Sequence, residues 1–328
     1  MSEAQQLENK PCGVCGSSQS THLFEARDYI YGNAGSWPVA QCANCGVVFM
    51  NPRIPPAAIG PFYPKTYYTN SGETRVNDSF RDRLKYYLIR RCYGYPPVGQ
   101  TSILIRIIGT LLRPLASRMG TFQHNIRHVP GGRVLDVGCG NGWCLDTYKR
   151  LGWQTYGTEM GPDSAKLAQE AGHNVFLGEL KDARYPDNSF DVLTLWDALE
   201  HIHNPAETIA ELNRVCRPGG WIYIYVPNYG SGYARRFRDR WFMFTAPLHY
   251  YHYTAESLTL LLNKEGFNQV EMHFPLGGAG FKPTLAAATL GQPIRHALVT
   301  RGPLAYLLKL ADRLMPDGHL LAIARKQA

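Results

Sequence analysis

The feature that most constrains the fold is a short apolar run that leads directly into a glycine-rich turn. The run Val134-Leu135-Asp136-Val137 has the character of a buried strand, and Gly138-Cys139-Gly140-Asn141-Gly142 follows at once. A strand, a glycine turn and a helix start in this order are typical of the edge where open α/β sheets bind nucleotide-like ligands. The sequence therefore predicts a cofactor-binding α/β domain.

The rest of the C-terminal two thirds supports this fold. From Arg133 onward, short apolar runs alternate with helical patterns, which indicates a largely parallel sheet with helices on both faces. Helices are predicted to begin near Gly142, Pro162 and Pro205, and one more is predicted over Ala255–Glu265. The seven predicted strands are Arg133–Val137, Gln154–Thr158, Asn174–Leu177, Asp191–Trp196, Trp221–Val226, Gln269–Phe274 and His319–Ala324.

The 328 residues exceed the usual size of a single core, so more than one domain is expected. We predict a small module over residues 1–60, a linker and helical cap over 61–128, and the cofactor-binding domain over 129–328. Lid insertions are predicted near 229–253 and 276–315. The apolar positions of the cap recur at helical spacing among arginines, which predicts one or two amphipathic helices between Phe80 and Arg127.

Charge at the loop distinguishes between cofactors. A dinucleotide loop presents bare amides to a pyrophosphate, whereas here Asp136 lies at the turn and Trp143 occupies the position of the third small residue. A carboxylate repels phosphate but favours the sulfonium and ammonium groups of S-adenosylmethionine (SAM). Glu159 ends the second predicted strand and is spaced to accept both ribose hydroxyls. The alternatives are a glycine turn that only allows the strand and the helix to pack together, and a dinucleotide site.

Four motifs in order resemble the class I SAM-dependent methyltransferases, especially the branch of the ubiquinone-biosynthesis O-methyltransferases. They are VLDVGCGNG, then Glu159, then SFDVLTLWDALEHI, then LNRVCRPGGWIYIYVPN, over about residues 130–275. The resemblance implies a Rossmann-like seven-stranded sheet with helices on both faces. The stretch FLGELKDARYPDNSFD lacks the usual Asp-Ala pair of the family. The implied cofactor-binding residues are Asp136, Gly138, Cys139, Gly140, Glu159, Met160, Glu179, Leu180 and Trp196.

Two CxxCG knuckles in the N-terminal module predict a zinc site. Cys12 and Cys15 form the first pair, and Cys42 and Cys45 form the second. Four thiolates at this spacing suit one tetrahedral zinc, with redox or chance cysteines as the alternative. Because four thiolates leave no open coordination position, this zinc is expected to staple a zinc-ribbon module rather than to act on substrate.

The chemistry requires a nucleophile aligned with the methyl group and usually a base that removes its proton. His249 and His201 are the predicted catalytic residues, because histidine can accept a proton near neutral pH. Asp197, Glu200 and His201 fall at i, i+3 and i+4 of a helical turn, and the matching set in some ubiquinone O-methyltransferases is associated with magnesium. Structural packing and hydrogen bonding are the alternative for both sets.

The predicted function is SAM-dependent methyl transfer to a small-molecule acceptor, with a hydroxyl group of a natural product, sugar or quinone-like compound as the target. An RNA methyltransferase and a non-catalytic zinc adaptor are the alternatives. The net charge of +8 suits an acidic partner such as RNA, but the sequence lacks an Asn-Pro-Pro-Tyr-like motif that would bind a nucleobase after the fourth strand. We expect a cytoplasmic protein, because the N-terminus carries no apolar leader and no run is long enough to span a membrane. The amphipathic stretch Ile103–Arg118 is expected to close the pocket or to contact a membrane surface.

Overall fold

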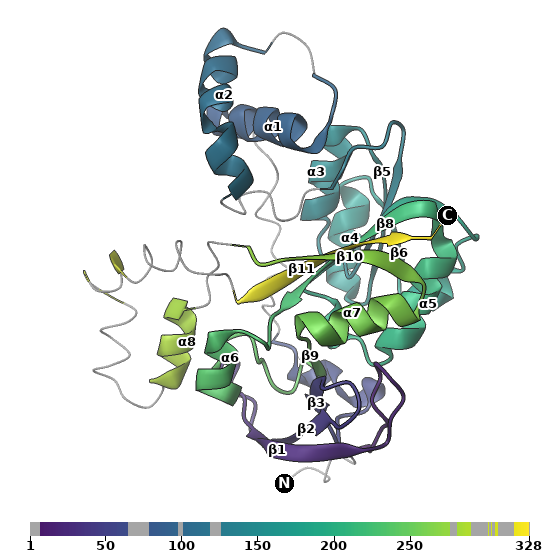
Figure 1. Cartoon of the computed structure of the whole chain (residues 1–328), viewed down its shortest axis with the longest axis vertical. Helices are drawn as coiled ribbons and strands as arrows, with labels where there is room; N and C mark the ends of the chain where they lie inside the picture. Colours follow the sequence, from purple (N-terminus) through teal and green to yellow (C-terminus); the bar gives the residue numbers. More distant parts are fainter. Residues whose placement is uncertain are drawn as a thin grey trace. The chain divides into compact units, whose positions relative to one another are not determined.

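A computed structural model of the chain describes residues 7–64, 79–97, 101–118, 126–275, 281–289, 301, 303, 306, 307 and 318–327 (Figure 1). The chain divides into two compact units, each assembled from separate stretches. The first unit comprises Met1–Lys65, Asp197–Ala210 and Ile224–Ala324. The second comprises Thr66–Trp196, Glu211–Tyr223 and Arg325–Ala328.

The larger sheet has seven strands in the order β10-β11-β8-β7-β4-β5-β6. Strand β4 pairs in parallel with β5 and β7, and β5 pairs in parallel with β6. The strands are β4 (Arg133–Val137), β5 (Gln154–Glu159), β6 (Asn174–Leu177), β7 (Phe190–Trp196), β8 (Cys216–Pro227), β10 (Phe267–His273) and β11 (His319–Lys326). The predicted seven-stranded α/β sheet is confirmed.

The predicted strand Trp221–Val226 differs most in its start. Strand β8 begins at Cys216, five residues before the predicted start, and so includes the run Arg217-Pro218-Gly219-Gly220. This run ends a helix, as predicted, but it does not prevent an extended backbone. The guanidinium of Arg217 binds the Asp191 carboxylate of β7 at 2.7 Å, which holds the start of β8 beside that strand.

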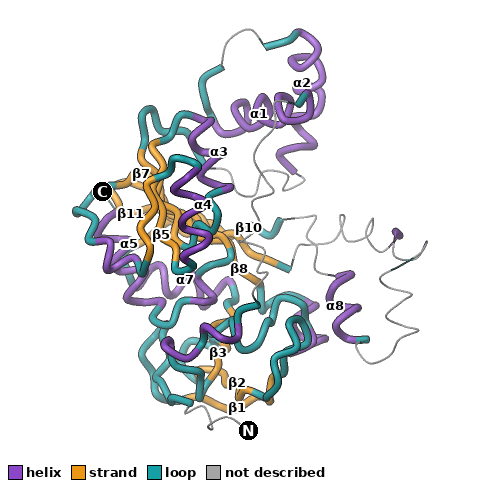
Figure 2. Tube along the Cα trace, turned by 180° about the vertical axis from the view of Figure 1, so that it is seen from behind, coloured by secondary structure: helices purple, strands orange, loops and turns teal. Residues whose placement is uncertain are grey.

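Helices of the second unit begin and end at the residues that favour caps. Helix α1 (Phe80–Tyr93) starts after Ser79, whose hydroxyl accepts the amide of Asp82, and ends at Gly94 in the left-handed conformation. It packs against α2 (Ile103–Arg118), as Figure 1 shows. Helices α3 (Trp143–Leu151) and α4 (Pro162–Glu170) both lie against β5, beside which Figure 2 shows them, and α4 also contacts β6. All four helices match the predicted helical segments.

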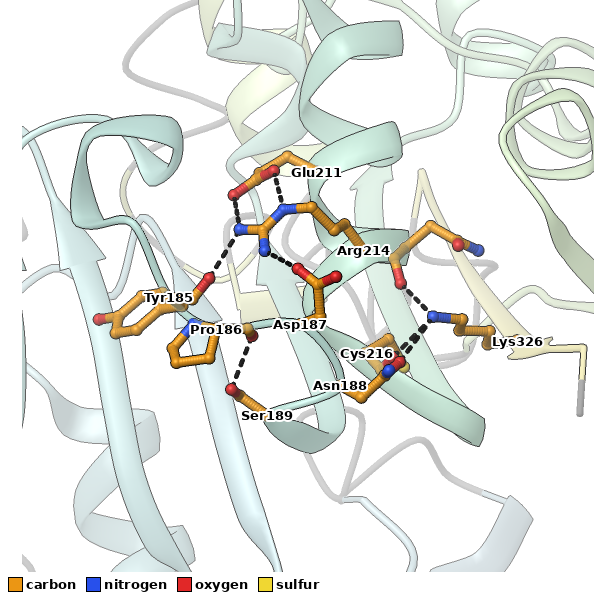
Figure 3. A network of polar contacts seen from close by, with 10 residues as sticks. Tyr185, Pro186, Asp187, Asn188, Ser189, Glu211, Arg214, Cys216 and Lys326 are labelled. Carbon is orange, nitrogen blue, oxygen red and sulfur yellow. Dashed lines mark hydrogen bonds and ion pairs between the residues drawn. The ribbon is translucent and has the colours of Figure 1, made fainter.

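A polar network ties the last turn of α5 (Pro205–Val215) to the loop before β7 (Figure 3). The Arg214 guanidinium binds the Glu211 and Asp187 carboxylates and donates to the carbonyl of Tyr185 at 2.7 Å. At the same helix end, the Lys326 ammonium donates to the carbonyls of Asn213 and Cys216 and to the side chain of Asn188. A cation at a helix C-terminus satisfies carbonyls that have no partner within the helix.

The first unit holds a small sheet in the order β1-β2-β3-β9. Its strands are β1 (Ser20–Ala26), β2 (Trp37–Cys42), β3 (Val48–Met50) and β9 (Tyr251–His252), and the paired strands are antiparallel. Its helices are α6 (Gly232–Phe237), α7 (Ala255–Lys264) and α8 (Phe281–Ala288). Short 3-10 helices cover Pro56–Ala58, Gly60–Phe62, Leu199–His201 and Arg238–Arg240, and one in the second unit covers Leu180–Ala183.

The N-terminal cysteine-rich segment shares its hydrophobic core with residues far along the chain. Trp37, Val39 and Met50 pack in one buried cluster with Trp241 and Phe244. Strand β3 also pairs with β9, where Val48 faces His252. The segment therefore folds as part of the first unit.

Some predicted features fall outside the described residues. Of the predicted insertion at 276–315, the structure describes α8 and a few further positions, and parts of the predicted linker, 65–78 and 119–125, are likewise outside. Within the described part of the chain, no helix combines the length and the apolar character needed to cross a membrane.

Candidate functional site

The glycine-rich loop joins β4 to α3 through three glycines in the left-handed region. Gly138, Gly140 and Gly142 have φ angles of 73°, 54° and 84°, where a side chain would be strained. The amides of Gly138 and Cys139 both donate to the carbonyl of Thr158, at 2.9 and 3.1 Å. The loop is therefore fastened to the end of β5 by its own backbone.

Glu159, the last residue of β5, completes this fastening. One carboxylate oxygen accepts the amide of Gly140 at 2.8 Å, and the other accepts the amide of Gly161 at 2.7 Å. Three successive loop amides are thus engaged, so they are not presented to a phosphate as in a dinucleotide loop. A carboxylate has about four lone-pair positions. The two that these amides leave on the half-buried Glu159 carboxylate suit a pair of hydroxyl donors.

Asp136 lies within β4 rather than in the turn, because its backbone pairs with Gly157 and Thr194 on the neighbouring strands. Its side chain is 2% exposed and accepts the hydroxyl of Thr194 at 2.6 Å. Burial raises the pKa of the Asp136 carboxyl to about 7; the Thr194 hydrogen bond opposes this rise, and the negative charge of Glu159 adds to it. The carboxyl therefore titrates near neutral pH beneath the loop.

The other predicted cofactor-binding residues follow the ends of successive strands. Met160 comes directly after β5 and is 64% exposed, while Leu180, shortly after β6, is buried. The carboxylate of Glu179 pairs with Lys181 at 2.8 Å. Trp196 ends β7 and donates its ring N–H to the hydroxyl of Tyr148 at 2.9 Å. Their contacts with a cofactor stay a prediction.

Comparison with known proteins identifies the family. The sequence profile described as "Methyltransferase domain" matches residues 108–272, which is half of the chain. The chain belongs to this methyltransferase family. The predicted membership is thereby confirmed, and SAM is the cofactor that this family uses.

Individual relatives match the methyltransferase over a shorter stretch. A ubiquinone biosynthesis O-methyltransferase of Burkholderia thailandensis is 33% identical over 109 residues, which is 31% of this chain and 47% of that protein. The ubiquinone biosynthesis O-methyltransferase of Hahella chejuensis is 37% identical over 109 residues, which is 30% of this chain and 45% of that protein. The chain thus matches about half the length of these curated relatives.

Solved structures with a similar fold have low sequence identity. A SAM-dependent methyltransferase of Thermotoga maritima, described as a possible histamine N-methyltransferase, aligns with a TM-score of 0.44 and 18% identity, over 61% of this chain and 84% of its own. The [4+2]-cyclase SpnF aligns with a TM-score of 0.43 and 20% identity, over 75% of this chain and 93% of its own.

The structure of this methyltransferase brings the four predicted zinc ligands together. The Sγ atoms of Cys12 and Cys45 are 3.5 Å apart, and so are those of Cys15 and Cys42. All four Sγ atoms lie within 4.8 Å of one another. The glycine after each second cysteine has a positive φ, and its amide closes the knuckle turn on the carbonyl of the first cysteine. The set fits a tetrahedral zinc.

The predicted catalytic histidines lie in the first unit, where His249 is buried and His201 is half-buried. The Nδ1 atom of His249 is 2.8 Å from the carbonyl of Met243, and that of His201 is 3.0 Å from the carbonyl of Leu248. The two rings meet edge-on, 4.5 Å apart. Burial lowers the pKa of His201 to about 4 and that of His249 well below its usual range. Both rings are therefore neutral at pH 7.

Glu200 joins these histidines. One ligand atom from each of Glu200, His201 and His249 lies within 4.8 Å of the others, whereas the predicted third ligand, Asp197, lies beside His319. Both carboxyl oxygens of Glu200 are buried without a hydrogen-bond partner among the described residues, and burial raises the pKa of this carboxyl well above its usual range. The observed group therefore differs from the predicted metal set by one residue.

Two polar residues escaped the sequence analysis. Arg53 is 4% exposed, and it binds the Glu8 carboxylate at 3.0 Å and the carbonyl of His203 at 2.7 Å. His319 opens β11 and lies 3.1 Å from the Asp197 carboxylate. No local sequence signal marks either residue, because each contact joins segments that are far apart along the chain.

Proposed function

We propose that this chain transfers the methyl group of SAM to a hydroxyl group of a small-molecule acceptor such as a natural product, a sugar or a quinone-like compound. The observation that carries the proposal is the Glu159 carboxylate, which binds the loop amide of Gly140 and keeps acceptor positions for two more donors. This arrangement suits the ribose diol of SAM and disfavours a pyrophosphate.

The roles of the remaining loop residues follow from charge and position. SAM supplies an electrophilic methyl group on a sulfonium, and a nearby carboxylate stabilises that cation. Asp136, beneath the loop, would supply this negative charge once it is ionised. Met160 would lie with Glu159 at the ribose. Glu179 with Leu180, which follow β6, and Trp196, which ends β7, would flank the adenine.

His249 and His201 are the bases that the sequence predicts. The lowered pKa keeps each ring neutral, so a lone pair is present at pH 7. A base must also reach the acceptor. Replacement of each histidine by asparagine, with methyl transfer and SAM affinity measured side by side, separates a base from a packing residue. A base loses turnover and keeps SAM affinity.

The four cysteines would hold a structural zinc. No coordination position would remain open, so the ion would not act on substrate. The group of Glu200, His201 and His249 offers two imidazoles and a carboxylate, a donor set that suits a divalent transition metal. Metal analysis of the purified protein, with and without the Glu200→Gln change, tests this second site independently of the zinc.

Calorimetry with SAM tests the whole proposal. Binding in the micromolar range followed by transfer of a labelled methyl group to a small-molecule fraction supports it, while no binding would refute every methyltransferase function. Binding without turnover would favour the adaptor. Salt-dependent RNA affinity together with methylation of RNA would favour the RNA methyltransferase that the net charge of +8 suggests.

Peripheral membrane contact is proposed for α2. Four large apolar side chains of this helix are more than half exposed, namely Ile103, Leu104, Ile107 and Leu111. They fall at i, i+1, i+4 and i+8, which is one face of a helix, and Arg106 and Arg113 lie on the same element. Sedimentation with anionic vesicles tests this, and Leu111→Glu should release the protein from them. Unchanged sedimentation would favour closure of the pocket.

A further inference from the structure

A set of contacts within the second unit holds the end of the glycine-rich loop, where the loop joins α3. Gly142 is the last residue of the loop and has a φ angle of 84°. A side chain at this position would place its Cβ atom 3.0 Å from Cδ2 of His173 and 3.0 Å from Cβ of Ala168 on α4. The backbone of Gly142 therefore lies directly against the His173 ring and against α4.

The imidazole of His173 has a partner on each nitrogen. Its side chain is fully buried, directly before β6. Nδ1 lies 2.9 Å from the hydroxyl of Thr155 on β5, and Nε2 lies 3.1 Å from the carboxylate of Asp146 on α3. Because a carboxylate only accepts, Nε2 carries the proton of the neutral ring and Nδ1 accepts the Thr155 hydroxyl. The ring thus joins β5 to the first turn of α3.

The next turn of α3 holds the same segment through a lysine. The Lys149 ammonium donates to the carbonyls of Ala171 and Gly172 at 3.2 and 3.0 Å, just after the end of α4. A cation at the C-terminus of a helix satisfies carbonyls that lack a partner within the helix. We use the name loop clasp for these residues, which are Asp146, Lys149, Thr155 and the turn 171–173.

Asp146 passes this restraint to the loop. Its backbone amide donates to the carbonyl of Gly142 at 2.8 Å, so the residue that binds His173 is also bonded to the end of the loop. Two residues before Gly142, the amide of Gly140 donates to the Glu159 carboxylate at 2.8 Å. A displacement of Gly142 would therefore move an amide that orients Glu159.

A histidine at position 173 does more than fill space. Burial of a polar ring costs free energy unless its nitrogens are hydrogen-bonded, and an apolar side chain of similar size fills the same volume without this cost. The two hydrogen bonds of His173 are directional. They fix the orientation of the first turn of α3 relative to β5, whereas an apolar ring would fix only the spacing.

We infer that His173 is a positioning residue of the SAM site. Its neutral ring, held in the loop clasp, fixes Gly142 and keeps the loop in the conformation in which Glu159 receives the ribose. His173 acts through the loop, so its role rests on the proposed binding of the ribose by Glu159. It takes part in no step that forms or breaks a bond.

Protonation of His173 would disturb the loop clasp. A second ring N–H would face the oxygen of Thr155, whose own hydroxyl proton would then need another acceptor. Burial lowers the pKa of His173 and Lys149 adds to this, while the hydrogen bond and the charge of Asp146 oppose it. Among the described residues, Asp146 and Lys149 are the charged groups that act on the ring, and both belong to α3. SAM affinity should therefore fall in acid.

The first experiment compares His173→Phe and His173→Gln in the full chain by calorimetry with SAM at pH 8. Phenylalanine keeps a ring against Gly142 but loses both hydrogen bonds, so the dissociation constant should rise about ten-fold. The amide nitrogen of glutamine takes about the place of Nε2 and donates to Asp146, so this variant should stay within about three-fold of the wild type. A merely structural role would lower stability in urea and leave the SAM affinity of the folded variant unchanged, which would overturn the inference.

Asp146 gives a second test that stands if His173→Phe does not fold, because its side chain is partly exposed. Asp146→Asn keeps an oxygen that accepts the Nε2 proton and should bind SAM nearly as the wild type does. Asp146→Leu removes that acceptor and should weaken SAM binding about ten-fold. Combined with His173→Phe, it should weaken binding no further, since both changes remove one interaction. Equal SAM affinity in the asparagine and leucine variants would overturn the role of this bond.

The pH dependence is measured in the Asp136→Asn background, which removes the carboxyl that titrates near the same pH. From about pH 7 to about pH 5, SAM affinity should fall with His173 present and stay constant with His173→Gln, because only histidine gains a proton in this range. His22→Gln is the control, since His22 forms an exposed pair with Glu25. An equal fall with and without His173 would overturn the inference, whereas a wild type that does not bind SAM would refute the proposed function.

Discussion

Asp136→Asn distinguishes the effect of the buried carboxyl on the free energy of unfolding from its contribution to SAM affinity. The replacement keeps an oxygen that can accept the hydroxyl of Thr194, now 2.6 Å from the carboxyl, and it removes the charge. The folded-state pKa of Asp136 is about 7, against 3.8 for an unperturbed aspartate. Because the folded state holds this proton more tightly than the unfolded state, the carboxyl stabilises the fold fully below about pH 4. This stabilisation is lost as the pH rises through about 7.

The size of the effect follows from the shift of the pKa. A difference of about three units corresponds to a free energy on the order of 4 kcal/mol that the wild type loses between low pH and pH 8 and the variant does not. The unfolding free energy of the SAM-free variant should therefore exceed that of the wild type by about 1.5 kcal/mol at pH 5 and by up to about 4 kcal/mol at pH 8. SAM affinity should change in the opposite sense: the dissociation constant of the variant at pH 8 should rise about ten-fold or more, because a charge-assisted contact is lost.

Urea unfolding at pH 5 and pH 8 and calorimetry with SAM measure the two effects. In the wild type, SAM affinity should increase from pH 6 to pH 8 as the carboxyl ionises, and the variant should show no such increase. Asp163→Asn, which changes an exposed aspartate on α4 of the same unit, is the control. A variant that is less stable than the wild type at pH 8, or one that binds SAM unchanged, would refute the reasoning.

Three further changes probe other parts of the chain. Glu159→Gln should raise the dissociation constant for SAM about ten-fold or more. The amide NH₂ of the glutamine would face one of the two backbone N–H groups that now donate to the carboxylate. Calorimetry that shows unchanged SAM affinity would mean that the ribose binds elsewhere. Cys42→Ser should lower the zinc content and the thermal stability, and a zinc-free variant with wild-type melting temperature would contradict the stapling role. Lys326→Met should lower the unfolding free energy by about 1–2 kcal/mol in urea with SAM affinity unchanged, because the half-buried ammonium closes the end of α5.

The sheet could be predicted because its signal is local. Strands β4 and β7 are short apolar runs, and α3, α4 and α5 each begin at a proline or directly after a glycine, so periodicity and breakers suffice. The loop after β4 is equally local. Its glycines need positive φ angles, and Glu159 reaches it from the end of the neighbouring strand.

The first unit could be predicted only in part, because its contacts join residues that are far apart in the sequence. Strand β3 pairs with β9, about two hundred positions later, and the cluster around Trp37 includes Trp241 and Phe244. Such pairings leave no periodic pattern in either segment. The cysteine spacing revealed the metal ligands, but it did not reveal that their segment shares its core with the chain around residue 241.

The residues that the sequence did not reveal show why side-chain pairings between distant segments cannot be predicted from local patterns. His319 is an isolated histidine at the start of a strand, and it pairs with Asp197, which lies more than one hundred residues earlier and has a positive φ angle. A helical turn at Asp197 would have placed it with Glu200 and His201, as the i, i+3, i+4 spacing predicts. The left-handed turn instead separates Asp197 from that face and brings its carboxylate to 3.1 Å from Nε2 of His319. Backbone conformation at one residue thus decides whether this carboxylate belongs to a metal set or pairs with a histidine on a distant strand.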